Sequence, residues 1–412
     1  MDPVLQLIKA EEKRQEETLM MIPSENYTYP EVRAAVGSVL MHKYSEGYPF
    51  KRYYQGNKYV DEIETITVKL AKKVFGTPHA NVQSYSGSPA NAAVYFGLLK
   101  HGDTIMGMNL ASGGHLTHGH PKITFSGKYF NSIQYGLNKN GIIDYGKLAR
   151  LANKHKPKLI VAGLTAYPRV LEWVKFAKIA DSVNAILMAD ISHIAGLVAG
   201  GAHPSPAGYA HVITTTTHKT LRGPRGALIM VTAKGQRRDS DMGQKIDRAV
   251  FPGLQGGPHN NQTAGIAIAL RLAQGKAFGD YAKKVVSNAK TLAQELSFHG
   301  FEIVSGGTDN HLMLVDLRPK NILGKPFAIA LEQAGIVVNY NAIPNDPQPP
   351  MNPSGIRIGT PALTVRGMGK PEVRQIAGWI SDVAENMEDK KVLKDIKKQV
   401  KTLCKEFPID WK

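Results

Sequence analysis

The sequence predicts an α/β protein built around a mostly parallel sheet. Residues 158–163 and 185–190 have the composition of buried strands, and a helical pattern near 172–182 separates them. Strand, helix, strand is the repeating unit of a parallel sheet. The four threonines at 214–217 indicate another strand, because β-branched side chains pack well on a pleated surface. Such sheets bind ligands beyond the carboxyl ends of their strands, so the residues at these ends are the first candidates for a site.

The length and composition describe a globular protein with more than one domain. The 412 residues suffice for two or three cores, and 42% hydrophobic with 21% charged residues exclude a disordered or fibrous chain. The single cysteine, Cys404, excludes an internal disulfide framework and a thiolate metal cluster, which fits a reducing cytoplasm. Charged residues occupy the N-terminal stretch where an export signal has its apolar core. No run of about eighteen apolar residues occurs, so we expect a cytoplasmic protein without a membrane partner.

The net charge of +17 raises nucleic-acid binding as another class of function. The basic residues are spread along the chain, and the densest group, 390–405, has the spacing of the polar face of a terminal helix. We interpret this group as a solvated helix face and expect no nucleic-acid partner. The excess positive charge also favours the approach of an anionic substrate.

A candidate binding loop follows a predicted helix at residues 4–20. Residues 44–56, YSEGYPFKRYYQG, are rich in tyrosine, glycine, proline and charge, as binding loops are. Glu46 is the only carboxylate in this loop, which leaves two interpretations open. It is either a proton-transfer group or the acid of a surface ion pair with Lys51 or Arg52.

A second candidate segment follows a helical pattern at residues 61–75. Residues 80–99 indicate a short strand, a Ser-Gly-Ser turn and a helix, with Ser88 as the N-cap and Pro89 at the first helical position. The free amides of residues 86–88 would form an anion site suited to a phosphate group.

Histidines and an aspartate follow the next strands. A predicted strand at 103–108 leads into a loop with His115 and His118, which have no acidic or thiol neighbour, so we expect no metal. A histidine ring lying against a flat cofactor is the functional alternative. Asp190 ends an apolar strand, with His193 three residues on. This carboxylate is either a helix cap or ion-pair partner, or the partner of a cofactor ring nitrogen.

One lysine stands at a strand-to-loop corner. Lys219 follows the threonine strand and has His218, Arg222 and Arg225 as neighbours. Neighbouring cations disfavour an ammonium, which predicts a lowered lysine pKa and a nucleophilic amine suited to a Schiff base. The simpler alternative is a strand followed by a solvated basic turn.

The last third of the chain indicates a smaller domain. A glycine- and proline-rich loop at 249–263 precedes a helix at 264–273, and the composition changes near residue 275. Arg357 lies in a short apolar strand, where a fixed guanidinium fits a substrate carboxylate.

Taken together, these segments resemble the serine hydroxymethyltransferase family over residues 22–361. The matching motifs are SEGYP, KRYY, SGGHLTHG, HIAGLVA, HPSP, TTTTHKTLRGPRG, VFPG, QGGP, VSGGTDNHL and SGIRIGTPA. The resemblance implies an aspartate-aminotransferase-like fold (fold type I), with a seven-stranded, mostly parallel sheet and a smaller α+β domain. It also implies a homodimer with shared active sites. We expect an N-terminal arm at 1–45, a large cofactor-binding domain at 46–275 and a small domain at 276–412.

The family depends on pyridoxal 5'-phosphate and interconverts serine plus tetrahydrofolate with glycine plus 5,10-methylenetetrahydrofolate. By resemblance, Lys219 holds the cofactor aldehyde as a Schiff base, Asp190 keeps the pyridine nitrogen protonated and His115 stacks on the ring. The further cofactor contacts that the resemblance implies are Ser86, Gly87, Ser88, Thr165, Thr216, His193, His218 and Arg225, with Gly256 and Gly257 from the second subunit.

The resemblance also implies substrate and folate contacts. Arg357 would bind the substrate carboxylate, with Ser24 beside it. Tyr44, Glu46 and Tyr54 would reach in from the partner subunit, Glu46 for proton transfer and Tyr54 to orient the substrate. The implied folate contacts are Leu110, Leu116, Phe251 and Asn341. The implied catalytic set is Lys219, Glu46, Tyr54, His115 and Thr216.

Some positions depart from the family pattern. They are Phe50, Gln55, Tyr85, Pro89 and Tyr340, where the family usually has Gly, Gly, His, Gln and Lys. Pro89 is compatible with helix geometry, so phosphate binding should persist. Tyr340 stands next to the expected folate residue Asn341 and therefore leaves the pterin carrier open.

Three functions remain to be separated. The first is the hydroxymethyltransferase reaction. The second is a folate-independent cleavage of threonine-like 3-hydroxy amino acids, or a transferase that uses a modified pterin. The dependence of serine cleavage on the pterin separates these two. The third is nucleic-acid binding without catalysis, which salt-sensitive binding and the lack of cofactor colour would indicate.

Overall fold

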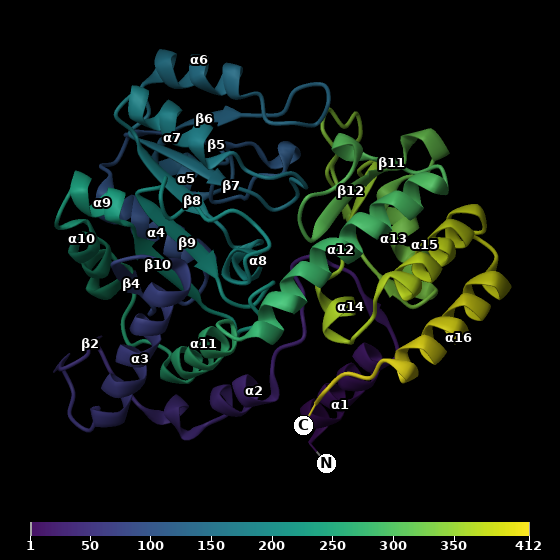
Figure 1. Cartoon of the computed structure of the whole chain (residues 1–412), viewed down its shortest axis with the longest axis horizontal. Helices are drawn as coiled ribbons and strands as arrows, with labels where there is room; N and C mark the ends of the chain where they lie inside the picture. Colours follow the sequence, from purple (N-terminus) through teal and green to yellow (C-terminus); the bar gives the residue numbers. More distant parts are fainter. Residues whose placement is uncertain (1, 412) are drawn as a thin grey trace. The chain divides into compact units, whose positions relative to one another are not determined.

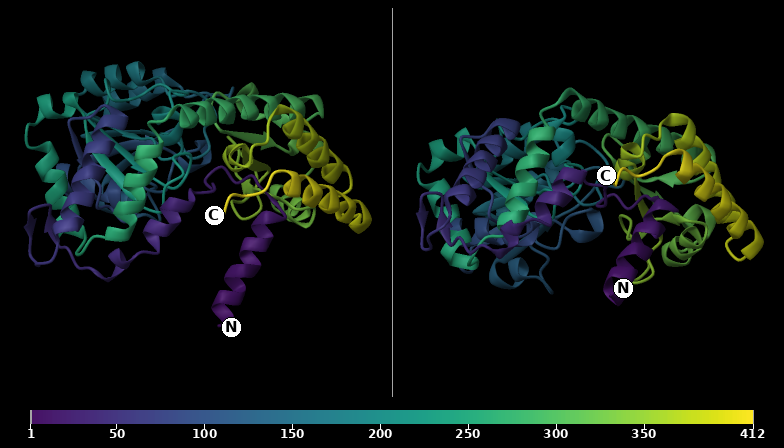
Figure 2. Two further views of the ribbon diagram at one scale, coloured as in Figure 1. Left: turned by 60° about the horizontal axis from the view of Figure 1, so that its bottom comes forward. Right: turned by 90° about the horizontal axis from the view of Figure 1, so that it is seen from below.

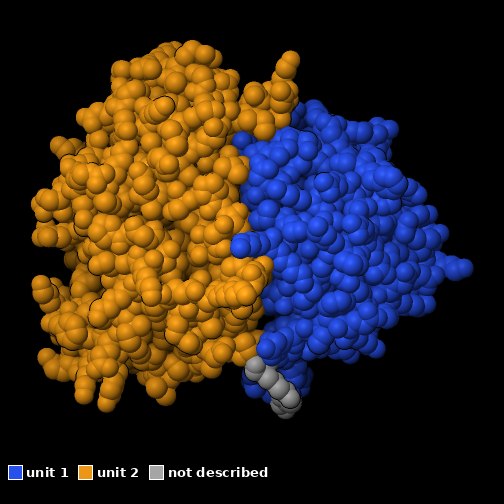
Figure 3. Space-filling view, in the orientation of Figure 1, with its two compact units in different colours: residues 1–27, 166–169, 283–412 blue, residues 28–165, 170–282 orange. Residues whose placement is uncertain are grey.

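The computed structural model describes residues 2–411 and divides into two compact units (Figure 3). Unit 1 comprises Met1–Tyr27, Ala166–Arg169 and Lys283–Lys412, and unit 2 comprises Thr28–Thr165 and Val170–Ala282. The chain passes from unit 2 to unit 1 within the long helix α12 (Lys276–Phe298). The division at 1–45, 46–275 and 276–412 stays a prediction.

Unit 2 is built on the seven-stranded sheet that we expected (Figure 1). Its strands, in spatial order, are β4 (His79–Asn81), β10 (Ala227–Val231), β9 (Val212–Thr216), β8 (Ile186–Asp190), β7 (Leu159–Gly163), β5 (Thr104–Met108) and β6 (Asn131–Tyr135). Strand β10 runs antiparallel to β4 and β9, and the other pairs are parallel. The prediction of a mostly parallel sheet is confirmed, and the carboxyl ends of β7, β8 and β9 meet at one edge.

Both faces of this sheet are buried by helices. All five residues of β7, β8, β9 and β10 are buried, as expected for strands covered on both sides. Alternate residues such as Leu159 and Val161 join the apolar side chains of α4 and α10 in one core. The helices of unit 2 are α2 (Pro30–Val36), α3 (Lys58–Phe75), α4 (Gly87–Leu98), α5 (Phe125–Tyr129), α6 (Tyr145–His155), α7 (Trp173–Ser182), α8 (Ala195–Ala199), α9 (Ala233–Arg238), α10 (Met242–Arg248) and α11 (Asn260–Leu272).

The start of α4 differs from the prediction by two residues. Ser86, with extended backbone, is the N-cap, and the helix begins at Gly87, so Ser88 is not the cap. Pro89 is therefore the third helical residue. The position still tolerates proline, because amides in the first turn of a helix have no partner within the helix.

Unit 1 contains a four-stranded antiparallel sheet covered by helices. Its strands, in spatial order, are β11 (Glu302–Ile303), β12 (Leu312–Asp316), β15 (Gly355–Gly359) and β14 (Asn339–Asn341). A separate parallel pair joins β1 (Leu19–Met20) to β13 (Ile336–Val337). The helices are α1 (Pro3–Glu16), α13 (Gly324–Gln333), α14 (Pro361–Val365), α15 (Lys370–Glu385) and α16 (Lys390–Glu406).

The two terminal helices differ in how they are packed. Helix α1 has no buried residue and extends away from the other elements of its unit (Figure 2). Helix α16 buries an apolar stripe that includes Leu393, Ile396 and Val400, which leaves its lysines on the opposite face. No helix within residues 2–411 combines the length and the apolar character needed to cross a membrane.

Candidate active site

Asp190, the last residue of β8, lies buried among hydrogen-bond donors. Its Oδ2 accepts from Asn91 Nδ2 at 2.9 Å and lies 3.0 Å from His118 Nε2. Its Oδ1 accepts from the backbone N–H of Ser192 at 3.1 Å. Burial acts to raise the pKa of Asp190, but its hydrogen bonds, first of all the one from His118, outweigh it and hold this pKa below its usual range. The carboxylate is therefore ionised and able to hold a protonated ring nitrogen.

The loop after β5 places two histidines beside this carboxylate. His118 Nδ1 accepts from the backbone N–H of His115, so its proton is on Nε2, facing Asp190. His115 Nδ1 lies 2.7 Å from Thr117 Oγ1. Burial and the neighbouring His118 lower the pKa of His115 to about 4. The ring of His115 is thus neutral at physiological pH and suited to stacking on an aromatic cofactor.

The start of α4 packs closely against the end of β9. A Cβ atom added to Gly87 would lie 2.7 Å from Thr216 Cγ2, so this position requires glycine. Thr216 itself is fixed, because its backbone N–H donates to Ser192 Oγ at 3.0 Å. The N-terminal amides of the helix, which has 12 residues, open beside Ser86 and suit a phosphate group.

Lys219 lies in a tight turn directly after β9. Its backbone carbonyl accepts from the N–H of Arg222 at 3.1 Å, and Gly223 N–H donates to the Thr217 carbonyl at 2.7 Å. The Arg222 guanidinium lies over the Tyr29 ring, 3.8 Å from the centroid. These contacts hold the half-buried lysine at the same sheet edge as Asp190.

The neighbours of Lys219 show the effect of its charge. Burial, followed by the charges of Lys219 and Arg225, lowers the pKa of His218 to about 3. Thr165, after β7, donates from Oγ1 to the Gly114 carbonyl at 2.8 Å. This bond links the end of β7 to the loop after β5 that carries His115 and His118, here called the histidine loop. The lowered pKa of the lysine itself stays a prediction.

The hairpin β2 (Gly47–Tyr48) and β3 (Lys51–Arg52) carries the second group of expected residues. Tyr54 Oη donates to Glu46 Oε2 at 3.3 Å, and the rings of Tyr44 and Tyr54 meet edge to face with centroids 5.5 Å apart. A Cβ atom on Gly256 would lie 3.1 Å from Glu46 Oε1. The residues that the resemblance assigns to the partner's site thus form one cluster in this chain.

Arg52 does not pair with Glu46. Its guanidinium, only 3% exposed, bonds Asp61 Oδ1 at 2.8 Å and Glu64 Oε2 at 2.6 Å, so the surface ion pair between Arg52 and Glu46 is excluded. Its Nη1 donates to the carbonyls of Ser45 and Gly47, both at 2.8 Å. These two residues flank Glu46, so Arg52 holds the backbone on both sides of the candidate proton-transfer group.

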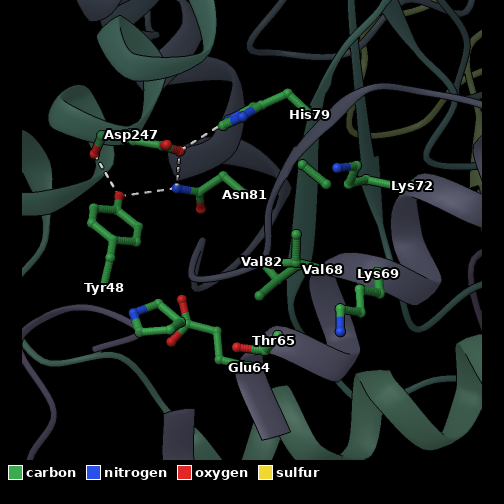
Figure 4. Close-up of a pocket in the computed structure, with 12 residues that line it drawn as sticks. Tyr48, Glu64, Thr65, Val68, Lys69, Lys72, His79, Asn81, Val82 and Asp247 are labelled. Atoms are coloured by element: carbon green, nitrogen blue, oxygen red, sulfur yellow. Dashed lines mark hydrogen bonds and ion pairs between the residues drawn. The ribbon is translucent and has the colours of Figure 1, made fainter. Parts of the chain in front are cut away.

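A cavity of about 360 Å³ borders this hairpin. Tyr48 of β2 lines it together with Glu64 of α3 and Asn81 of β4 (Figure 4). Asn81 Nδ2 donates to Asp247 Oδ1 at 2.8 Å, and Tyr48 Oη donates to the Asp247 carbonyl at 2.6 Å. His79 Nε2 lies 3.2 Å from Asp247 Oδ1. These bonds tie the hairpin to β4 and α10. Within the described residues, no group of three or more metal-ligating side chains is placed to hold an ion.

The expected folate residues of unit 2 lie in two places. Phe251 is buried and packs edge to face on Tyr48 and Tyr53, next to the hairpin. Leu110 and Leu116 belong to the histidine loop and are 44% and 38% exposed, as suits side chains available to a ligand.

Unit 1 contains Arg357, Ser24 and Asn341. Arg357, on β15, donates from Nε to Asn339 Oδ1 at 3.1 Å. Burial lowers the pKa of Arg357 to about 10, opposed by the charge of Glu25, so it stays protonated at neutral pH. The Gly359 N–H donates to the Met21 carbonyl, which brings the Ser24 segment alongside this strand.

Comparison with known proteins identifies the family. The sequence model of serine hydroxymethyltransferase matches residues 1–380. Relatives of that name are 54% identical in Acidothermus cellulolyticus and 53% identical in Desulfotalea psychrophila, over 99% of this chain and 95% and 94% of theirs. The chain belongs to the serine hydroxymethyltransferase family. Serine hydroxymethyltransferases are pyridoxal-phosphate-dependent transferases with tetrahydrofolate as co-substrate, and the resemblance seen in the sequence is confirmed.

The residues present in unit 2 fit this cofactor. An ionised carboxylate, a neutral histidine ring, a helix start with an obligatory glycine and a lysine all stand at one sheet edge. Sequence reasoning did not find the support given by Asn91, His118 and Arg52. Asn91 and His118 bond Asp190 from 99 and 72 residues away, and no local pattern marks such partners.

Proposed function

We propose that this chain catalyses the reversible transfer of the serine hydroxymethyl group to tetrahydrofolate, giving glycine and 5,10-methylenetetrahydrofolate. The observation that carries this proposal is the placement of Asp190 and Lys219 at the ends of neighbouring strands, where the start of α4 at Gly87 packs against Thr216. Pyridoxal phosphate, when bound there, supplies an electron sink for the substrate α-carbon. We propose Ser86, Gly87 and Ser88 as its phosphate contacts.

Within this proposal each side chain of unit 2 has a physical task. The carboxylate of Asp190 would accept a hydrogen bond from the protonated ring nitrogen, and it stays ionised because His118 and Asn91 hold it. The Lys219 amine forms the covalent link, as the primary amine that follows β9. The neutral ring of His115 covers one face of the cofactor and excludes water from it. Thr165, His193, His218, Thr216 and Arg225 are the proposed supporting contacts.

We assign the substrate carboxylate to Arg357 and the proton transfer at the serine hydroxyl to Glu46. Ser24 assists the first, and Tyr44 and Tyr54 orient the second. We propose a homodimer, located in the cytoplasm, in which the Glu46 cluster serves the neighbouring subunit and Gly256–Gly257 contact the cofactor phosphate of that subunit. The gathering of these residues in one cluster supports their assignment to one and the same site.

Tetrahydrofolate, rather than a modified pterin, is the carrier that we propose. Tyr340 packs against the core of unit 1. Side chains alternate along a strand, so Asn339 and Asn341 face the other way, and Asn339 bonds Arg357. The departure at Tyr340 is therefore turned away from the face that carries Asn341. Phe251, Leu110 and Leu116 are proposed as further folate contacts.

The visible absorption spectrum of the purified protein tests this function. We expect a band from lysine-bound cofactor, and a longer-wavelength band with glycine that grows strongly when tetrahydrofolate is added. A yellow protein that ignores folate would indicate the folate-independent aldolase. A protein that stays colourless with added pyridoxal phosphate would overturn the proposal.

Replacement of the lysine sharpens this test. Lys219→Ala should lose the borohydride-reducible link to the cofactor and its turnover, because no other amine ends β9. Lys234→Ala, on α9, is the matched control and should retain both. Unimpaired turnover by Lys219→Ala would refute the assigned role.

A further inference from the structure

Tyr85 connects two segments that are distant in the sequence. It immediately precedes the helix start at Ser86, and its Oη donates to the Gly257 carbonyl at 2.7 Å. Its ring stacks on His259, with centroids 4.1 Å apart and planes 7° from parallel. Its backbone N–H donates to Gln255 Oε1 at 3.1 Å. The loop is thus held at three successive points by one residue.

The Gly256–Gly257 segment is confined on its other side as well. A Cβ atom on Gly257 would lie 3.0 Å from the Tyr44 ring, so a larger residue there would have to displace this ring. A cavity of about 620 Å³ opens here, lined by both tyrosines, both glycines and His259. Backbone amides on such an edge bind anions well only if the backbone is fixed.

We propose that Tyr85 is a positioning residue that couples the phosphate sites of two subunits. Its main chain leads into Ser86–Ser88, which contact the cofactor phosphate of its own subunit. Its side chain fixes Gly256–Gly257, which contact the phosphate in the neighbouring subunit. This inference rests on the proposed function, which supplies both phosphate contacts.

The coupling acts on the phosphate and not on the rest of the cofactor. Tyr85→Phe removes the hydroxyl that orients the Gly257 carbonyl but keeps the ring on His259. The loss of one such hydrogen bond should weaken pyridoxal phosphate binding about five- to tenfold. Pyridoxal, which lacks the phosphate, should bind to the variant and to the unchanged protein equally well.

Mixed dimers determine in which subunit Tyr85 acts. In the first, one protomer carries both Tyr85→Phe and Lys219→Ala, and its partner is unchanged. In the second, the two substitutions are on different protomers. Differently tagged chains are co-expressed and purified, and pyridoxal phosphate is titrated while the absorbance of lysine-bound cofactor is followed. This absorbance reports only the site with an intact Lys219.

We expect weakened binding in the first mixed dimer and normal binding in the second, because the loop that serves the intact site comes from the other protomer. Weakening only in the second, in both, or in neither overturns the coupling, as does a protein that sediments as a monomer. Tyr145→Phe, on α6, is the control and should bind normally. If the unchanged protein does not prefer pyridoxal phosphate to pyridoxal, the phosphate contacts of the proposed function fail instead.

Discussion

At the scale of single residues, Glu46 shows how its surroundings define the role proposed for a carboxylate. Its half-buried side chain meets the Tyr54 hydroxyl, and the charge of Glu46 raises the pKa of Tyr54. The tyrosine therefore stays a donor to Glu46 at neutral pH. A half-buried carboxylate with one hydrogen-bond donor is suited to accept and return a proton.

Glu46→Gln tests this role, because it keeps the shape and the bond from Tyr54 but cannot transfer a proton. We expect cofactor and glycine binding to be retained and folate-dependent serine cleavage to fall by about 10²- to 10⁴-fold. Steady-state cleavage and glycine titration measure the two effects. Glu62→Gln, at an exposed position of α3, is the matched control. Serine cleavage at the unchanged rate would place the acid elsewhere.

The sequence predicted Asp190 and Lys219 as candidates because both stand where a strand pattern ends. It left two interpretations of Asp190 open, since the decision depends on Asn91 and His118. These partners come from α4 and from the histidine loop, and only the folded sheet brings them together. Chemistry at strand ends is thus visible in a sequence, whereas the side chains that tune it are not.

At the scale of elements, the β2–β3 hairpin depends on a buried ionic network. Arg52 is surrounded by Asp61 and Glu64, whose side chains are 9% and 4% exposed. Gln83 Nε2 donates to Glu64 Oε1 and to the Gly47 carbonyl. The network joins the hairpin to α3 and to the segment after β4.

Arg52→Ala should destabilise the protein by about 3 to 5 kcal/mol, because two carboxylates remain buried without their partner. It should also lower serine cleavage through the misplaced Glu46 loop. The urea midpoint and the cleavage rate measure these effects. The neighbouring Lys51→Ala, whose side chain is exposed, should change stability by less than about 0.5 kcal/mol. Equal effects of the two substitutions would contradict the network's role.

The elements themselves were largely predictable. The strand patterns at 103–108, 158–163 and 185–190 correspond to β5, β7 and β8 within a residue at each end. The helix start near Ser88 was misplaced, because serine at 86 and serine at 88 are equally good caps by composition. In the fold the helix begins at Gly87, where the backbone passes so close to Thr216 that a Cβ atom would lie 2.7 Å from its Cγ2.

At the scale of the whole molecule, the fold class follows from the sequence, but the place of one short segment in unit 1 does not. Unit 1 includes residues 166–169 in addition to both ends of the chain. Arg169 bonds Asp309 at 3.1 Å, and Asn310 Nδ2 donates to the Tyr167 carbonyl at 3.2 Å. No change of composition marks this short segment, because its assignment depends on contacts with residues about 140 positions away.

Histidines of unit 2 make the stability of the whole molecule sensitive to acid. Burial lowers the pKa of His115 and His211 to about 4 and that of His218 to about 3. His211 Nδ1 accepts a hydrogen bond from the Leu187 N–H at 2.9 Å. Protonation of this nitrogen would break that hydrogen bond. All three side chains therefore favour the neutral form in the folded protein.

Folding stability should decrease as the pH is lowered. An unfolded histidine binds a proton near pH 6.5, above the folded pKa values, so the unfolded state takes up protons first as the pH falls. Stability should be constant above about pH 7 and decrease between pH 6.5 and 4, by about 3 kcal/mol for each buried histidine. Urea midpoints across this range measure it. His211→Gln should flatten the slope and His42→Gln, at an exposed position, should not; the same slope in all three proteins would show that carboxylates, not histidines, cause the loss.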